Sequence, residues 1–128
     1  MNVVDSSCWL EYIAGRPNAG AFSGPIEDTD QLIVPTIVLL EVFKQVLQWK
    51  DQPTALRVAG DMSRGRVVDL DATIALAAAQ ISHELKLPLA DSVILATARR
   101  YGATLWTQDA DFADIDGVWF FPKKTSAG

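Results

Sequence analysis

Short apolar segments alternate with longer helical stretches along the chain, and this alternation restricts the possible folds more than any other feature. The apolar segments are Met1–Val4, Leu32–Val34, Arg66–Leu70, Thr104–Thr107 and Val118–Phe121. Each is too short for a helix and has the composition of a strand. Strands that are joined through helices pair in parallel, and parallel sheets are covered on both faces. We therefore predict an α/β fold with a mostly parallel sheet of four or five strands.

Helix start and stop signals lie between these segments. Ser6 or Ser7 is the expected cap of a first helix that Gly15 ends, and Asn18–Asp30, rich in Gly, Pro and acids, is expected to be a loop with room for one short helix. The other expected helices are Thr36–Lys50, about ten residues from Pro53, Ala72–Leu85 after a cap at Asp71, and Leu89–Tyr101 before Gly102. Residues 1–128 are predicted to form one domain, with a polar tail at 123–128.

The composition excludes several classes of protein. With 49% hydrophobic and 21% charged residues the chain can bury a core, and no apolar stretch approaches the ~20 residues of a membrane span. Cys8 is the one cysteine, so no intramolecular disulfide can form, which fits a cytoplasmic protein. The net charge of −5 argues against binding nucleic acid through bulk charge.

Acidic residues gather where the predicted strands end. Ligands of open α/β sheets bind beyond the carboxyl ends of the strands. Asp5 ends the first strand, Asp109 and Asp111 follow the fourth, and Asp91 lies in the first turn of the helix before it. Glu41 lies less than two helical turns after Pro35, which closes the second strand.

Each of these acids also has an ordinary structural explanation. Asp5 can begin the first helix, Asp109 and Asp111 can form an Asx turn, and Asp91 can face the helix dipole. Glu41 can belong to a solvated stripe, which consists of Glu41, Lys44, Gln45 and Gln48.

Taken together, the acids favour a metal site. No nearby motif supplies a Lys or Arg to pair with them, and converging carboxylates raise one another's pKa unless a cation lies between them. A ligand set made only of oxygens favours Mg²⁺ or Mn²⁺, ions that activate water and stabilise charge on a phosphoryl group.

Asp5 after the first strand, Glu41 after the second, the stretch from Leu89 to Ala98 around Asp91, and the motif Thr107–Phe112 together resemble the PIN domain, in particular the VapC-type toxins of toxin–antitoxin pairs. The resemblance covers nearly the whole chain. It implies a three-layer α/β/α sandwich and a Mg²⁺- or Mn²⁺-dependent endoribonuclease.

By motif match, the implied catalytic and metal-binding residues are Asp5, Glu41, Asp91 and Asp109. Ser7 and Thr107 match supporting polar positions, and Asp111 matches a less central acid. Glu41 would then mark the inner end of a substrate groove continued by the other three residues of its polar stripe. The implied partners are RNA, a second copy of the chain and a VapB-like antitoxin that covers the site.

Two other classes of protein share this size and this kind of sheet. A receiver-like phospho-signalling domain needs paired acids after strand one, an aspartate after strand three and a lysine after strand five, a pattern that Asp69 and Lys123 fit only loosely. A phosphatase of the haloacid dehalogenase type needs a D-x-D motif at strand one, and Asp5-Ser6-Ser7 does not supply it.

Overall fold

The computed structural model describes residues 1–124 and contains one five-stranded, fully parallel sheet. Its strands are β1 (Asn2–Val4), β2 (Leu32–Pro35), β3 (Arg66–Val68), β4 (Thr104–Thr107) and β5 (Val118–Phe120). All five predicted strands are present. The prediction of a mostly parallel sheet is confirmed.

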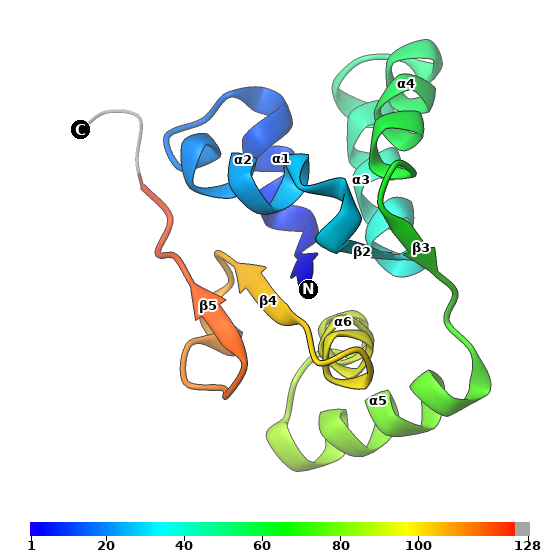
Figure 1. Cartoon of the computed structure of the whole chain (residues 1–128), viewed down its shortest axis with the longest axis vertical. Helices are drawn as coiled ribbons and strands as arrows, with labels where there is room; N and C mark the ends of the chain where they lie inside the picture. Colours follow the sequence, from blue (N-terminus) through cyan, green and yellow to red (C-terminus); the bar gives the residue numbers. More distant parts are fainter. Residues whose placement is uncertain (125–128) are drawn as a thin grey trace.

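The strands lie in the order β3-β2-β1-β4-β5, so the first strand is the central one (Figure 1). Val4 of β1 is in register with Trp106 of β4, and the backbone N–H of Asp5 donates to the carbonyl oxygen of Trp106 at 2.9 Å. Because all strands run the same way, their carboxyl ends meet at one edge of the sheet.

Six α-helices and two short 3-10 helices connect the strands. The α-helices are α1 (Ser6–Ala14), α2 (Ala19–Glu27), α3 (Thr36–Trp49), α4 (Gln52–Met62), α5 (Ala72–Leu85) and α6 (Leu89–Arg100), and the 3-10 helices are η1 (Thr29–Gln31) and η2 (Ala110–Phe112). α1 and α2 lie on one face of the sheet and α6 on the other, with α5 outside α6 and the α3–α4 hairpin beside β2 (Figure 1). The result is the expected α/β/α sandwich.

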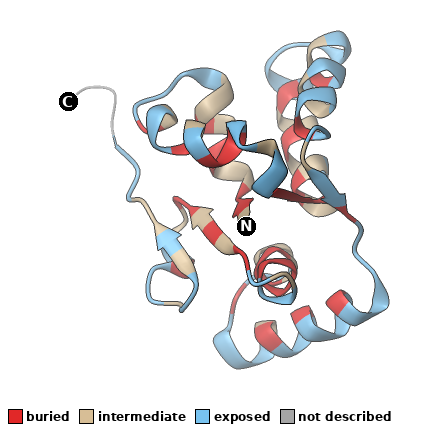
Figure 2. Ribbon diagram, in the orientation of Figure 1, coloured by how far each residue is buried: buried red, intermediate tan, exposed pale blue. Residues whose placement is uncertain are grey.

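The core lies between the sheet and the inner faces of these helices (Figure 2). Val3, Ile33 and Leu105 of the three middle strands are fully buried, whereas α5 buries only the side that faces α6. No helix in residues 1–124 combines the length and the apolarity needed to cross a membrane.

One prediction about local structure was wrong, and one was incomplete. The cap of α1 is Asp5, one residue before the predicted serines, because its extended backbone places the carboxylate over the N–H of Ser6. The segment expected to be a loop with room for one short helix consists largely of the nine-residue helix α2. Phe22 and Ile26, four residues apart on one side of this helix, are buried, and that burial outweighs the poor helix propensity of its glycines and of Pro25.

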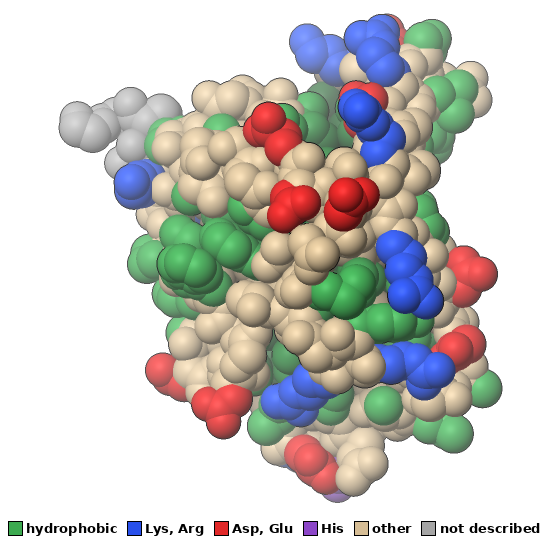
Figure 3. Space-filling view, in the orientation of Figure 1, with side chains coloured by type: hydrophobic (Ala, Val, Ile, Leu, Met, Phe, Trp, Pro, Cys, Tyr) green, Lys and Arg blue, Asp and Glu red, His purple; other side chains and the backbone are tan. Residues whose placement is uncertain are grey.

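Basic side chains do not form a continuous surface on the face seen in Figure 3. They are spread from α4 past β3 toward α5, with acidic side chains between them. The polar tail expected at 123–128 lies mostly outside the described residues, which include only its first two positions.

Candidate metal centre and substrate groove

Asp5 lies where β1 ends and α1 begins, and its carboxylate is almost fully buried, with 4% of the residue exposed. The hydroxyl of Thr107, at the end of β4, donates to Asp5 Oδ2 at 2.8 Å. Ser7 Oγ donates to the same oxygen at 3.2 Å, and the N–H of Ser6 donates to Oδ1 at 2.8 Å. Asp5 therefore caps the first helix and also faces the carboxyl edge of the sheet, so the two explanations offered for it do not exclude each other.

Ser6 connects Asp5 to the acid on the neighbouring helix. Its hydroxyl lies 3.0 Å from Oε1 of Glu41 and 3.4 Å from Oδ1 of Asp5, and it can donate to either. Glu41 is half-buried on α3. Sequence reasoning named Ser7 as a supporting residue and missed Ser6, although its place directly after Asp5 was a usable signal.

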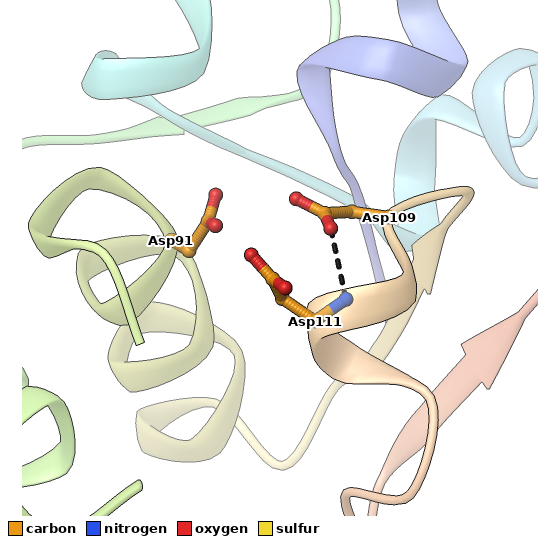
Figure 4. A group of neighbouring side chains, drawn as sticks. All are labelled: Asp91, Asp109 and Asp111. Atoms are coloured by element: carbon orange, nitrogen blue, oxygen red, sulfur yellow. Dashed lines mark hydrogen bonds between the residues drawn. The ribbon is translucent and has the colours of Figure 1, made fainter. Parts of the chain in front are cut away.

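The tightest group of acids consists of Asp91, Asp109 and Asp111, which offer carboxylate oxygens within 4.8 Å of one another. Asp91 projects from α6, and the other two project toward it from the start of η2 (Figure 4). Asp109 Oδ1 accepts from the N–H of Asp111 at 2.9 Å, so the Asx turn is also present. The resemblance treated Asp111 as less central, yet the structure places it in this group.

The backbone of the η2 loop is tied to Asp5 through one hydroxyl. Thr107 Oγ1, which donates to Asp5, accepts from the N–H of Asp109 at 2.9 Å. This buried side chain thereby orients the carboxylate of Asp5 and fixes the backbone that carries Asp109.

Burial and mutual repulsion raise the pKa of three of these acids. Burial is the main cause for Asp91, followed by repulsion from Asp5, Asp109, Glu41 and Asp111, and together they raise its pKa to about 7. Burial also raises the pKa of Asp5, although hydrogen bonds from Thr107 and the two serines oppose it. The pKa of Glu41 is raised by burial and by the charge of Asp5, against the hydrogen bond from Ser6.

These observations fit a divalent cation. The donor set contains only carboxylate oxygens, and the charges that raise the pKa of Asp91 are those of four other acids. A cation among these groups would relieve the repulsion, and hard oxygen donors suit Mg²⁺ and Mn²⁺.

A groove of about 470 Å³ begins at Glu41. Lys44, Gln45 and Gln48 line it together with Glu41, as expected for one stripe of α3. Ser6 and Ala90 also line it, so the groove reaches the residues beside Asp5 and Asp91.

Three buried polar residues beside the centre were not singled out from the sequence. They are Glu11, Asn18 and Gln108. Gln108 stands between Thr107 and Asp109 in the chain, which was the one available signal, whereas the role of Asn18 depends on contacts across the fold.

Comparisons with known proteins identify the family and the fold of the chain. The family model for the PIN domain matches residues 3–118. A toxin–antitoxin complex from Klebsiella pneumoniae contains a chain that is 25% identical, with a TM-score of 0.83 over 96% of this chain and 100% of that one. No curated protein sequence matches the chain.

Two further solved structures share the fold. DNA-bound VapBC from Salmonella typhimurium contains a chain that is 21% identical, with a TM-score of 0.72 over 94% of this chain and 96% of that one. The Mycobacterium tuberculosis toxin VapC20, described as cleaving the sarcin-ricin loop, is 19% identical, with a TM-score of 0.72 over 91% of this chain and 95% of that one.

Proposed function

The chain belongs to the PIN domain family, and from this premise we propose that it is a metal-dependent endoribonuclease, the toxin of a toxin–antitoxin pair. The observation that carries the proposal is the convergence of Asp91, Asp109 and Asp111 beside the buried Asp5. Such a centre, at the carboxyl edge of a parallel sheet, suits hydrolysis of a phosphodiester.

In this proposal Asp5, Glu41, Asp91 and Asp109 are the residues that hold Mg²⁺ or Mn²⁺, and Asp111 joins them at the exposed side. The bound ion supplies an activated water and stabilises negative charge on the phosphoryl group. The residues of the chain itself orient the carboxylates that bind the ion.

The hydroxyls around Asp5 set the direction of its carboxylate. Those of Ser7 and Thr107 donate to its Oδ2. Because the pKa of Asp91 is raised to about 7, this carboxyl is protonated in part of the metal-free molecules at neutral pH, and metal binding would favour its ionised form.

The groove along α3 is the proposed path of the RNA. Lys44 can contact a phosphate, and Gln45 and Gln48 can donate hydrogen bonds to phosphate and sugar oxygens. With a net charge of −5, attraction of RNA by the whole surface is weak, so binding depends on this local site and on the metal.

The proposed protein partners are a VapB-like antitoxin and a second copy of the chain. The Klebsiella pneumoniae relative is described as part of a toxin–antitoxin complex, and the Salmonella typhimurium one as VapBC bound to DNA. An antitoxin Arg or Lys can occupy the acidic centre in place of the metal through charge-assisted hydrogen bonds.

The receiver-like alternative does not fit the topology. Its phosphorylatable aspartate would be Asp69, which is exposed and follows the edge strand β3, with β2 between it and the central strand. The dehalogenase-type alternative still lacks a second acid at β1, where Ser6 and Ser7 follow Asp5.

The test is cleavage of single-stranded RNA by the purified protein with Mg²⁺, with Mn²⁺ and with EDTA. We expect cleavage only with metal, and its loss in Asp109→Asn. Asp69→Asn removes one negative charge at an exposed position away from the centre and serves as the matched control. Cleavage that continues in EDTA, or that survives in Asp109→Asn, would contradict the proposal.

A further inference from the structure

Gln108, Asn18 and Glu11 form a buried polar network directly behind the loop that carries Asp109 and Asp111. The three residues are only 4%, 3% and 6% exposed. Gln108 occupies the position between Thr107 and Asp109, so its side chain is fixed on the side of the loop opposite to Thr107.

The shortest contact in the network joins two amides. Asn18 Nδ2 donates to Gln108 Oε1 at 2.7 Å and also lies 3.0 Å from the carbonyl oxygen of Pro122. Asn18 therefore connects the start of α2 to the chain on either side of β5.

The remaining contacts involve the nitrogen of the Gln108 amide. Its Nε2 lies 3.4 Å from the carbonyl oxygen of Ser7 and 3.5 Å from Oε1 of Glu11. Glu11 Oε2 in turn accepts from the backbone N–H of Asn18 at 2.9 Å. A carboxylate with such low exposure is held here by amide donors, which also fix its orientation.

We propose that Gln108 and Asn18 are positioning residues, which hold the Thr107–Asp111 loop in the geometry that binds the metal. The inference rests on the proposed function, because it assigns these residues to the same centre. Asp109 is the N-cap of the short 3-10 helix η2 and Asp111 lies within it, and Phe112 is the one buried residue of this helix. The buried amide pair supplies the anchor that this segment lacks, as outer hydrogen bonds do for many metal ligands.

Hydrogen exchange in the metal-free protein tests the positioning role without RNA. The relevant amides are those of Asp109, bonded to Thr107 Oγ1, and of Asp111, bonded to Asp109 Oδ1. In Gln108→Met, which keeps an unbranched side chain of similar length and removes the amide oxygen and nitrogen, we expect exchange at these two positions to become about tenfold faster. Amides in the middle of α5 should keep their rates.

Asn18→Ala is the second variant, and it is 90 positions away from Gln108 in the sequence. Because it acts on the loop only through Gln108 and Pro122, it should accelerate the same two amides. Should Gln108→Met fail to fold, Asn18→Ala carries the test alone.

Binding of Mn²⁺ is the second readout. We expect both variants to bind Mn²⁺ about tenfold more weakly, within the 10–100-fold range for outer partners of metal ligands, and to lose kcat with little change in KM. The double variant should lose no more than the worse single one. The matched control is Ile74→Val, buried in α5 away from the centre, which should lower the melting temperature and leave Mn²⁺ affinity unchanged.

The outcomes separate this inference from the proposed function. Faster exchange at Asp109 and Asp111 with weaker Mn²⁺ binding supports the positioning role even if the wild type cleaves no RNA, a result that would overturn the proposed function alone. Variants that lose melting temperature but keep Mn²⁺ affinity and the two exchange rates, as Ile74→Val does, would overturn the positioning role.

Discussion

Replacing Asp91 with asparagine should make the metal-free protein more stable at pH 8, because ionisation of this carboxylate lowers the free energy of unfolding. Burial and four neighbouring acids raise its pKa from 3.8 to about 7. A raised pKa means that the folded state binds the proton more tightly than the unfolded state does. The free energy of unfolding therefore falls as pH rises from about 4 to about 7. Above pH 7 Asp91 is ionised and the destabilisation has its full size.

The size of the effect follows from the shift and from the exposure of Asp91. At ~1.4 kcal/mol for each pH unit, a change from 3.8 to about 7 corresponds to about 4 kcal/mol. Asp91 is only half-buried, so solvent screening reduces this to about 1–2 kcal/mol. For a domain of this length, that is a rise in melting temperature of roughly 3–8 °C in Asp91→Asn.

The assay is thermal unfolding of wild type and Asp91→Asn in EDTA between pH 5.5 and 8, repeated at pH 8 with millimolar Mg²⁺. Wild type should be more stable at pH 5.5 than at pH 8, and the variant should show a weaker dependence. At a hundred times its dissociation constant, Mg²⁺ should stabilise wild type by ~2.7 kcal/mol and the variant by much less. Asp69→Asn is the control for the loss of one charge.

The opposite pattern would refute this reasoning. If Asp91 serves only as a first-turn acid of α6, its charge interacts favourably with the helix dipole. Asp91→Asn would then melt below wild type at pH 8 in EDTA and would show the same Mg²⁺ response.

Two further predictions concern the edge of the centre and the groove. Asp111→Asn should weaken Mn²⁺ binding by less than Asp109→Asn does, because Asp111 is exposed and Asp109 is half-buried. Calorimetry measures both affinities, and equal affinity for wild type and Asp111→Asn would show that Asp111 is not a metal ligand. Lys44→Ala should raise KM for RNA several-fold and lower the salt dependence of binding while Mn²⁺ affinity stays unchanged; an unchanged KM would exclude Lys44 from the substrate path.

The parts of the fold that follow from local pattern were predictable. The five apolar segments became five parallel strands, and Asp71 caps α5 as its position suggested, with Oδ1 accepting from the N–H of Ile74 at 2.9 Å. α2 was expected only as one short helix within a loop, because its glycines and Pro25 oppose helix formation locally, while the burial of Phe22 that stabilises it is a tertiary effect.

The candidate site was predictable in composition and less so in arrangement. Acids at strand ends pointed to one edge of the sheet because parallel strands share their direction. Asp111 was predicted to be less central than Asp5, because the sequence does not show that η2 turns Asp111 toward Asp91. The amide pair of Asn18 and Gln108 joins positions 90 residues apart, which no local pattern predicts.

The bond from Thr107 to Asp5 spans 102 positions of the sequence, so the centre forms only when the chain closes a very long loop. Such non-local contacts make folding slow, because the entropy of closure is lost before the contacts are gained. During synthesis the central strand β1 is made before its neighbour β4 and before the loop with Asp109 and Asp111. On the proposed function, a ribosome that makes this protein is not exposed to its activity until β4 and this loop have been made. In a refolding experiment, binding of Mn²⁺ should accordingly be the last signal to appear.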